Sequence, residues 1–529
     1  MKDITKIMLG SVGTKVMLIF YALLSVGSGF LIIQGNEMLR GVFDNYLLTQ
    51  VYGVFGFRLA TTTSVFLLIF GVHILSEFLL QRFTWDGQAR LAEHYMRGLL
   101  RSKFSFFTKE EPPKIWSDLT TATQGTAHLY QSLVSTFDTF VRFVFYGIVV
   151  FSVDFYAGLF TLVALPIYFL ANWGAHKRFY PIQERRMKAM GELSVAANES
   201  FTDVANVKAK NSYDFFVGRI NKSQQVTSRL MCNFNVLYAY ISNISNLVSI
   251  IAPLLILFGA MQFSDTLTLD AGVVLVLYIN IPLLLSSFQG FHNLYINYKS
   301  RKPLVEKLKS FADIPAEQSG STTINTFESL STYGVKVNFE GERNVTVPDF
   351  TIVKGEKVMF SGESGVGKST IFNIVIGLIE DYEGDITING VNLREIDKDS
   401  LREVFGIAFQ SVNVMTLTLK ENILLGIESD DINEIIKLTN LKTQLESKSE
   451  QTLNSKVLSG GEKSRLGLAQ MLIRNPEVIF IDETFSSLDE EMEKQIITGV
   501  FEKYTDKTII CINHRSGSRA FFERVIEFN

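Results

Sequence analysis

Residues 361–370 restrict the folds open to this chain more than any other stretch. They read SGESGVGKST and place Gly362 and Gly367 on either side of four variable residues, directly ahead of Lys368 and Ser369. An apolar stretch before them predicts a strand, and a second apolar stretch after them predicts a helix. A strand, a glycine-rich turn and a helix N-terminus in this order form a cradle for phosphate groups.

Each part of this loop suits a nucleoside triphosphate and its metal ion. The glycines let successive backbone N–H groups point inward, and the helix N-terminus adds partial positive charge. The Lys368 ammonium can reach the β- and γ-phosphates, while the Ser369 hydroxyl can ligate Mg²⁺. A match this short also occurs by chance in unrelated glycine-rich turns, so its surroundings must decide. The residues predicted to bind the nucleotide are Gly362, Glu363, Ser364, Gly365, Val366, Gly367, Lys368, Ser369 and Thr370.

The two halves of the 529-residue chain differ in kind, and the length allows two or three domains. Up to about residue 300 the chain is rich in Phe, Leu, Ile and Val, whereas residues 309–330 form a polar linker and a mixed sequence follows. The first half holds six apolar stretches that fit a bilayer, and no small-residue cleavage site marks the first as a signal peptide. The predicted spans are residues 16–33, 60–80, 139–156, 158–173, 243–263 and 271–288.

Basic residues orient these predicted spans. The long connections between spans two and three and between spans four and five hold many lysines and arginines, whereas the short connections near residues 154 and 265–270 hold none. Because basic loops stay in the cytoplasm, both termini and both long connections are predicted to be cytoplasmic. We expect the long connections to continue the spans as helices and to turn near residues 107–116 and 213–216. These turns either press on the second half of the chain or are ordinary surface turns.

Two features near the membrane surface each allow two interpretations. Apolar side chains in residues 1–15 fall on one helical face, which predicts a helix lying on the cytoplasmic leaflet; a solvated tail is the alternative. Charges at membrane depth often mark a transport pathway. For Asp138 and Arg142, which lie four residues apart, mutual pairing on one helix face is the simpler interpretation, and Glu77 can lie at the membrane interface.

Charge and composition narrow the possible partners. The net charge of −4 gives no reason to expect a nucleic-acid partner. Cys232 and Cys511 lie far apart in the chain, which argues against a disulfide framework. The six histidines form no metal-binding motif, so the expected metal is the Mg²⁺ that accompanies a nucleotide.

Residues 478–483 predict a buried strand that ends in two acids. Asp482 would enter the Mg²⁺ shell, and Glu483 would orient and polarise the water that attacks the γ-phosphate. Gln410 follows another apolar run and can reach the Mg²⁺ or the attacking water. Strands that end in acids are common, so this pattern is weak by itself.

Residues 458–462 read LSGGE and are the sharpest signal in the chain. The Ser-Gly-Gly turn opens a helix, so the Ser459 hydroxyl and the amides of Gly460, Gly461 and Glu462 can form a second anion site. If the two anion sites lie on opposite lobes, one chain cannot bring the second onto its own bound phosphate, whereas a second subunit can. Asp489 follows the acidic pair and would lie at that subunit seam.

Two further residues are candidates for contact with the nucleotide. His514 follows a predicted strand and can hydrogen-bond the γ-phosphate as a neutral donor, although a lone histidine after a strand is usually structural. Phe339 lies on a predicted strand ahead of the cradle and could stack on adenine, as any exposed aromatic on such a strand could.

The order of these motifs resembles the ATP-binding cassette (ABC) family, and six spans ahead of one cassette resemble a half-transporter of the exporter type. The resemblance covers the whole chain. It implies a multidomain protein, with an all-α six-helix transmembrane domain at residues 1–308, a linker at 309–330 and an α/β P-loop nucleotide-binding domain at 331–529. It also implies two chains with two ATP molecules between them, each held by residues 362–369 of one chain and 459–461 of the other.

The sequence departs from the pattern of that family in four places. Gly341 stands where a tyrosine is frequent, and residues 452–457 lack the Gly-Glu pair common in exporters. The segment between Gln410 and Ser459 is short, which predicts a trimmed helical lobe, and few residues follow His514. None of these departures removes a predicted catalytic group. We also expect no leader-cleaving protease domain ahead of the membrane region.

The predicted function is ATP-driven export, or flipping of a lipid or peptide, coupled to ATP hydrolysis. An ATP-gated channel or sensor on the same fold is the alternative, and it would show ATPase activity without vectorial transport. A soluble cassette protein is excluded by the six apolar spans. The partner is predicted to be a second half-transporter, either an identical chain or a different one, in a multi-pass arrangement within lipid of a bacterial inner membrane. The transported substrate remains open among lipids, peptides, oligosaccharide carriers and amphipathic drugs.

Overall fold

The chain folds into two compact units. The computed structural model describes residues 2–44, 52–110, 112–202, 204–263, 270–339, 344–363, 365–410, 412–441, 458–513 and 516–528. The first unit holds residues 1–100 and 112–314, and the second holds residues 101–111 and 315–529. A short piece of the first long connection therefore belongs to the second unit.

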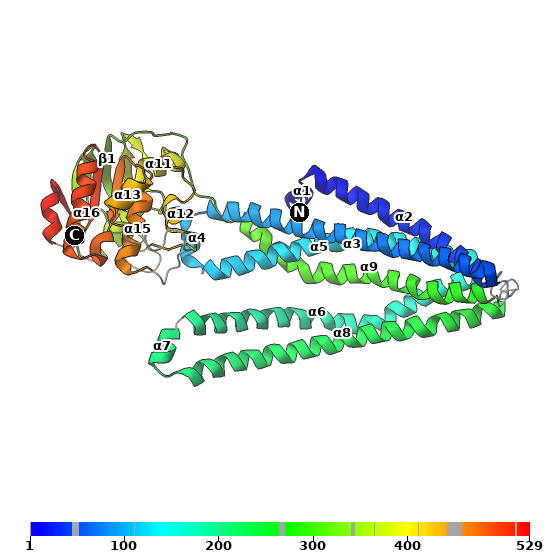
Figure 1. Cartoon of the computed structure of the whole chain (residues 1–529). Coiled ribbons are helices and arrows are strands. Elements are labelled where there is room, and N and C mark those ends of the chain that lie inside the picture. Colours follow the sequence, from blue (N-terminus) through cyan, green and yellow to red (C-terminus); the bar gives the residue numbers. More distant parts are fainter. Residues whose placement is uncertain are drawn as a thin grey trace. The chain divides into compact units, whose positions relative to one another are not determined.

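The first unit is built from helices (Figure 1). Helix α5 packs along α9, α6 along α8, and α2 along α3, while the α6–α8 pair separates from the others towards α7 (Figure 1). Its helices are α1 (Lys2–Met8), α2 (Val12–Val42), α3 (Tyr52–Leu100), α5 (Pro112–Val153), α6 (Phe155–Thr202), α7 (Val204–Ala209), α8 (Tyr213–Phe263) and α9 (Ala271–Ala312).

Five of these helices, within the residues that the structure describes, are long and apolar enough to cross a membrane. They confirm a helical membrane domain. The fourth predicted span, residues 158–173, corresponds to a shorter apolar helix at Phe155–Ile167, so the count of six stays a prediction. The helices α5 and α9 approach closely because glycines face the partner helix: a Cβ on Gly290 would lie 2.5 Å from Thr139 Cγ2.

The N-terminal helix α1 packs against protein, and the prediction that its apolar face lies in the leaflet is wrong. Ile4 and Met8 are fully buried. Arg90 of α3 donates from Nε to the Ile7 carbonyl at 3.2 Å and from Nη2 to the Met8 carbonyl at 2.9 Å. A guanidinium at a helix C-terminus satisfies carbonyls that the helix itself leaves unpaired.

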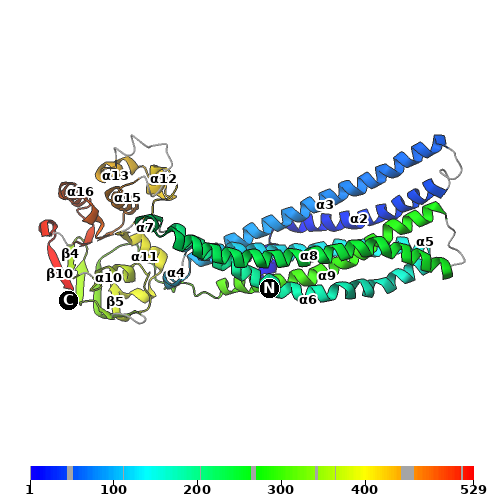
Figure 2. The same ribbon diagram turned by 90° about the horizontal axis from the view of Figure 1, so that it is seen from below.

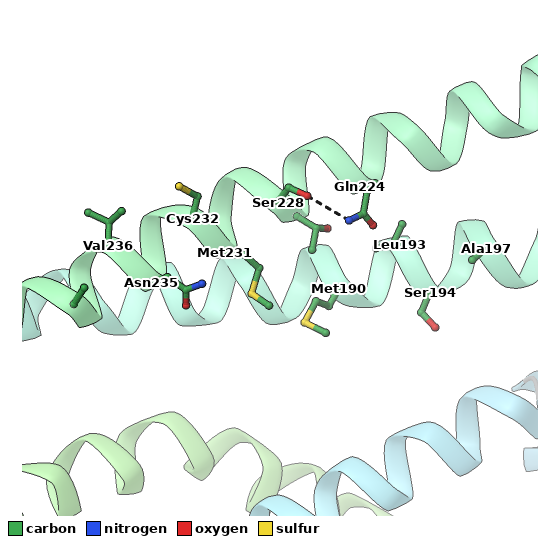
Figure 3. Close-up of a pocket in the computed structure, with 12 residues that line it drawn as sticks. Met190, Leu193, Ser194, Ala197, Gln224, Ser228, Met231, Cys232, Asn235 and Val236 are labelled. Carbon is green, nitrogen blue, oxygen red and sulfur yellow. Dashed lines mark hydrogen bonds between the residues drawn. The ribbon is translucent and has the colours of Figure 1, made fainter. Parts of the chain in front are cut away.

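A groove of about 940 Å³ lies between α6 and α8 (Figure 3). Met190 and Leu193 of α6 line it together with Met231 and Val236 of α8. Its lining is largely apolar, with the Thr227 hydroxyl donating to the Ala189 carbonyl across the pair at 3.3 Å. This part of the α6–α8 pair therefore presents an apolar face that the chain's own helices leave open.

The second unit contains two sheets. The antiparallel sheet has the order β2-β1-β5-β6, with β3 also paired to β1. Its strands are β1 (Ser329–Asn338), β2 (Asn344–Thr346), β3 (Phe350–Val353), β5 (Glu383–Ile388) and β6 (Val391–Asn392). The second sheet has the order β10-β4-β9-β8-β7, and every neighbouring pair is parallel. Its strands are β4 (Lys357–Gly362), β7 (Phe405–Ala408), β8 (Val478–Asp482), β9 (Thr508–Ile512) and β10 (Arg524–Phe528).

The parallel sheet separates two hydrophobic cores because successive side chains of a strand point to opposite faces. In β8, Val478 and Phe480 belong to one core, and Ile479 and Ile481 to the other. The first core contains α10 (Lys368–Val375), whose Phe372 stacks on Phe480 with ring centroids 4.2 Å apart.

The second core contains the helices α12 (Leu419–Leu424), α13 (Ile432–Leu438), α15 (Gly460–Leu472) and α16 (Glu490–Lys503). The helices α10 and α15 therefore cover opposite faces of the parallel sheet, as Figure 2 shows. The carboxyl ends of parallel strands share one edge, so β4, β7, β8 and β9 all deliver their last residues to the same place.

The segment of residues 101–111 that joins the second unit contains the short helix α4 (Phe104–Lys109). The Lys103 N–H donates to the Pro315 carbonyl at 3.0 Å, and Lys103 Nζ lies 3.1 Å from Glu380 Oε2. The first long connection therefore contacts the second half of the chain at residues 101–103, ahead of the predicted 107–116, for which the contact stays a prediction. The further helix α11 (Lys398–Val404) belongs to the same network, since Lys398 also pairs with Glu380.

Candidate functional site

The predicted phosphate cradle forms where β4 meets α10. Gly362, Gly365 and Gly367 have φ angles of 148°, 85° and 112°, values that side-chain-bearing residues rarely adopt. A Cβ on Gly367 would lie 2.1 Å from Val345 Cγ1, so close packing adds to the demand for glycine. The loop therefore has the glycine-dependent backbone that the sequence predicted, and its contact with a phosphate stays a prediction. Ser364 lies outside the described residues.

The Lys368 side chain folds back into this loop. Its ammonium donates to the Gly362 carbonyl at 2.8 Å and to the Glu363 carbonyl at 2.7 Å. Burial lowers the pKa of Lys368 from its ordinary value, and the nearby Glu483 and Asp482 carboxylates counter part of that effect. The two carbonyl oxygens thus hold the Lys368 ammonium within the loop.

Ser369 and Asp482 come together as a pair suited to a metal ion. The Ser369 hydroxyl donates to Asp482 Oδ1 at 2.9 Å. Burial raises the pKa of Asp482 above its ordinary value, while the hydrogen bond from Ser369 acts in the opposite direction. A hydroxyl and a carboxylate fit Mg²⁺, which typically takes one or two protein ligands and completes its shell with phosphate oxygens and water. The described residues contain no cluster of three or more His, Cys, Asp or Glu side chains that would bind a metal by themselves.

Glu483 and Gln410 meet beside this pair. Gln410 Nε2 donates to Glu483 Oε2 at 2.8 Å. The backbone of Glu483 has φ 46°, and its N–H donates to the Ile512 carbonyl of β9 at 3.1 Å. A non-glycine residue in the left-handed region is held there by its surroundings and often marks a functional position. The arrangement fixes a carboxylate and an amide where they can hold a water molecule.

The second predicted anion site begins helix α15 on the other face of the sheet. Ser459 forms a capping box with Glu462: its Oγ accepts from the Glu462 N–H at 3.3 Å, and its N–H donates to Glu462 Oε2 at 2.7 Å. The first-turn amides of Gly460 and Gly461 have no partner within the helix itself. The Ser459 hydroxyl is thus used locally, and its contact with a phosphate stays a prediction.

The remaining predicted residues have mixed outcomes. Asp489 caps α16, since its Oδ1 accepts from the Met492 N–H at 2.8 Å, and its position at a subunit seam is untested. Phe339 follows β1 and is 43% exposed, which leaves it available for stacking. His514 and Gly341 lie outside the described residues, as do residues 452–457.

Supporting polar residues carry no motif of their own and were missed from the sequence. The buried Thr484 donates from Oγ1 to the Ala408 carbonyl at 2.9 Å and so ties the ends of β7 and β8 together. Asn513 Nδ2 donates to Glu493 Oε1 at 2.6 Å, which fixes the end of β9. Their only signal in the sequence is that Asn513 directly follows β9 and Thr484 comes two residues after the end of β8.

Family comparisons match both units. The family described as "ABC transporter transmembrane region" matches residues 18–288, and the family described as "ABC transporter" matches residues 345–486. The transport/processing ATP-binding protein ComA of Streptococcus pneumoniae is 26% identical over 521 residues, which covers 93% of this chain and 71% of that protein.

Two further relatives and one solved structure are also similar to most of this chain. The lactococcin-A transport/processing ATP-binding protein LcnC of Lactococcus lactis is 24% identical over 93% of this chain and 70% of that protein. The ATP-dependent lipid A-core flippase of Vibrio parahaemolyticus is 25% identical over 78% of this chain and 73% of that protein. The structure of a bacterial Atm1-family ABC exporter with ATP bound has a TM-score of 0.77 at 18% identity, covering 98% of this chain and 93% of that one.

Proposed function

The chain belongs to the ABC transporter family, and from this premise we propose that it works as a dimer of two identical chains, each ATP being shared between them. It is a multi-pass membrane protein with a fused cassette, an ATPase and an ATP-driven exporter. Half-transporters of this family generally act in pairs. The proposal concerns which chain supplies each part of the site and what each part does.

One observation carries the proposed chemistry: a single sheet edge brings together Ser369, Asp482, Glu483 and Gln410 through two direct hydrogen bonds of 2.9 and 2.8 Å. These side chains come from α10, from the end of β8 and from the residues after β7. Their types fit binding of a triphosphate with its metal ion and orientation of an attacking water. A purely structural cluster would not need a buried carboxylate beside a strained glutamate.

Each residue of the site has a proposed role in binding or hydrolysis of ATP. Lys368 exchanges its two carbonyl partners for the β- and γ-phosphate oxygens, which its ammonium can contact without leaving the loop. Ser369 and Asp482 would hold Mg²⁺, which neutralises charge on the phosphates when it is bound. Glu483 orients the attacking water, and Gln410 holds the Glu483 carboxylate in place and contacts the same water. We also assign His514 to the γ-phosphate and Phe339 to adenine.

The dimer is supported by the placement of the two anion sites. Helix α10 and helix α15 cover opposite faces of the same sheet, so the residues Ser459–Gly461 of one chain are suited to an ATP held by another chain. The open apolar face of the α6–α8 pair gives the membrane unit a second surface for contact between copies. Binding of ATP would stabilise the closed pair by its difference in affinity for the closed and open forms.

The substrate is proposed from the relatives that align over most of the chain. Those named for the transport of lactococcin A and of mesentericin Y105 match 93% and 91% of this chain, against 78% for the lipid A-core flippase. We therefore place a lactococcin-like compound ahead of a lipid as the exported substrate. The bacterial relatives also favour a bacterial inner membrane with both termini in the cytoplasm.

The test uses the purified full chain in lipid vesicles with the cassette facing outward. We expect ATP-dependent accumulation of lactococcin A inside the vesicles, and loss of both accumulation and hydrolysis in Lys368→Ala. The exposed Lys494, five residues beyond the Asp489 cap of α16, supplies the control variant Lys494→Gln, which should behave as the parent protein. Hydrolysis without accumulation of any compound would favour the gated channel or sensor, and unchanged ATP binding by Lys368→Ala would remove the lysine from its role.

A further inference from the structure

A cluster of ionisable side chains lies where the membrane helices α2, α3 and α5 meet. On α5, Arg142 Nε pairs with Asp138 Oδ2 at 2.8 Å, as the sequence suggested. Arg142 Nη2 also contacts His73 Nδ1 of α3 at 2.6 Å. The buried Tyr21 of α2 interacts electrostatically with Asp138, Arg142 and Glu77. Three helices therefore contribute to one polar site within an otherwise apolar part of the molecule.

Hydrogen bonding fixes the charge of this cluster. A guanidinium can only donate, so His73 Nδ1 accepts and the neutral imidazole carries its proton on Nε2. Asp138 neutralises Arg142. The Glu77 carboxylate receives a hydrogen bond from the neutral Gln81 amide at 2.7 Å, and no lysine or arginine in the described chain forms an ion pair with it. The cluster as a whole therefore has one surplus negative charge.

The exposed members of the cluster form a polar stripe on α3. His73, Glu77 and Gln81 are spaced four residues apart and so share one face of the helix. The adjacent face is apolar and more than half exposed at Phe70, Ile74 and Phe78. Carboxylates at membrane depth almost always face a bundle interior or a water-filled cavity, because lipid tails cannot solvate them. The apolar face suits lipid, and the polar stripe suits an aqueous path.

Pairing of Asp138 with Arg142 explains two of these charges as a structural ion pair, but it leaves Glu77 without a counter-charge. A carboxylate without a counter-charge on an apolar membrane helix is costly, and a group of opposite charge bound beside it would lower that cost. His73 lies one helical turn before Glu77 on α3, and Tyr21 interacts electrostatically with Glu77, so polar groups of two helices lie near this carboxylate.

We propose that Glu77, with Tyr21, His73 and Gln81, binds a positively charged group of the exported compound, an ammonium or a guanidinium, on its way through the membrane unit. The proposal rests on the proposed export function and adds the charge class of the substrate. Glu77 supplies the counter-charge, and Gln81 orients its carboxylate. The Asp138–Arg142 pair positions His73 through the hydrogen bond to its Nδ1.

The test measures binding of tetraphenylphosphonium, a compact apolar cation, to the full-length protein in lipid nanodiscs by equilibrium dialysis, with empty nanodiscs subtracted. We expect saturable binding by the parent protein, at least tenfold weaker binding by Glu77→Gln, and recovery to within threefold of the parent in Glu77→Asp. The control is Glu93→Gln, also on α3 and also exposed, which should bind as the parent does. The size-matched anion tetraphenylborate should show no dependence on Glu77.

Unchanged binding of the cation by Glu77→Gln, or no saturable binding by the parent protein, would overturn the proposal. Melting temperatures of all variants establish that a loss of binding does not come from misfolding, and the Glu77→Asp variant provides a second check. Failure of the export function itself would appear separately, as ATP hydrolysis without accumulation of any compound in the vesicle assay, so the two proposals fail by different readouts.

Discussion

At the residue scale, Glu483 combines a strained backbone with a carboxylate held by Gln410. Changing Glu483 to Gln keeps the size of the side chain and an oxygen that can accept from the Gln410 amide. It removes the negative charge that polarises the attacking water. We expect turnover to fall by about 10²–10⁴-fold, the usual contribution of a general base, with ATP binding retained. Single-turnover hydrolysis and nucleotide binding measured on the same preparation check this.

The matched control for that variant is Glu502→Gln, at an exposed position near the C-terminal end of α16 and away from Asp489 at its N-terminus. It should hydrolyse ATP at the parent rate. Normal steady-state hydrolysis by Glu483→Gln would remove Glu483 from its assigned role.

The neighbouring Asp482 makes stability depend on pH. Burial raises the pKa of Asp482 in the folded, nucleotide-free protein, so its ionised form destabilises the fold at any pH above that raised value. The destabilisation disappears as the pH falls through the raised pKa towards the ordinary value. Asp482→Asn removes the charge but keeps an oxygen to accept from Ser369.

We therefore expect Asp482→Asn to melt at a higher temperature than the parent protein at mildly alkaline pH, without nucleotide. The difference in melting temperature between Asp482→Asn and the parent protein should become smaller as the pH is lowered into the acidic range. Asp430→Asn, at an exposed bend, is the control and should leave the melting temperature unchanged. A variant that melts below the parent at every pH would contradict the direction of the shift.

Sequence reasoning was strong for residues whose role follows from fixed spacing. The positions of Lys368 and Ser369 after the glycines predicted the cradle. The strand ending at Asp482 predicted a carboxylate beside Ser369, and the two side chains are hydrogen-bonded in the structure. Contacts that depend on the tertiary structure could not be predicted from the sequence, such as the hydrogen bond from the Thr484 hydroxyl to the Ala408 carbonyl. Sequence reasoning also did not foresee that the Ser459 hydroxyl caps its own helix; the contact of this hydroxyl with a phosphate stays a prediction.

At the scale of elements, helix α1 illustrates what an amphipathic pattern can establish. The pattern predicted one apolar face, and the structure confirms that face at Ile4 and Met8. The pattern cannot distinguish lipid from protein as the cover, because both present apolar surface. The cover was decided by Arg90, a residue distant in the sequence that the pattern does not include.

We expect Arg90→Gln to release α1. Two hydrogen bonds from a charged donor would be lost, each worth about 1.5–3 kcal/mol when the partner is charged. Limited proteolysis should then cut near the N-terminus faster than in the parent, while the rest of the chain stays resistant. Arg97→Gln, whose ion pair with Glu93 is fully solvent-exposed, is the control and should be cut at the parent rate. Equal cutting of both variants would show that Arg90 does not hold α1.

In the parallel sheet of the second unit, the strands could be predicted from local sequence patterns, but their order in the sheet could not. The sequence predicted strands ahead of the cradle, at 478–483 and ahead of His514, and all three pair in one parallel sheet with the strand formed by the apolar run before Gln410. Their order in the sheet, with β4 between β10 and β9, depends on crossovers that periodicity does not encode. That order brings Gly362, Gln410 and Asp482 to one edge.

At the scale of the whole molecule, ATP binding must be coupled to movement of the membrane helices. Lys103, in the segment 101–111 of the second unit, is a candidate residue for this coupling. Hydrogen bonding to Glu380 raises the pKa of Lys103 and keeps it charged. For Glu380, burial would raise the pKa, but hydrogen bonds from Lys398, the Gln318 N–H and Lys103 outweigh it and lower the value. The segment 101–111 is thus fastened to the cassette by a partly buried ion pair.

Lys103→Gln should weaken that link without touching the ATP site. A fluorescent label on the exposed Cys232 of α8 reports movement of the membrane unit, since Cys511 is buried and unreactive. We expect the ATP-induced change in fluorescence to fall by at least half in Lys103→Gln at unchanged ATP affinity. Lys494→Gln should give the full change. The same full change in Lys103→Gln would exclude this residue from the link.

The central claim, that two copies of this chain share each ATP, is tested most directly by directed crosslinking. Chains carrying Glu363→Cys and chains carrying Ser459→Cys, each with a different tag and with Cys232→Ser, Cys511→Ala and Glu483→Gln, are mixed in membranes and oxidised with Mg²⁺ and ATP. We predict a disulfide-linked product that bears both tags and forms only when ATP is present. A chain with both cysteines that closes the disulfide within itself, with no product joining two chains, would contradict the account.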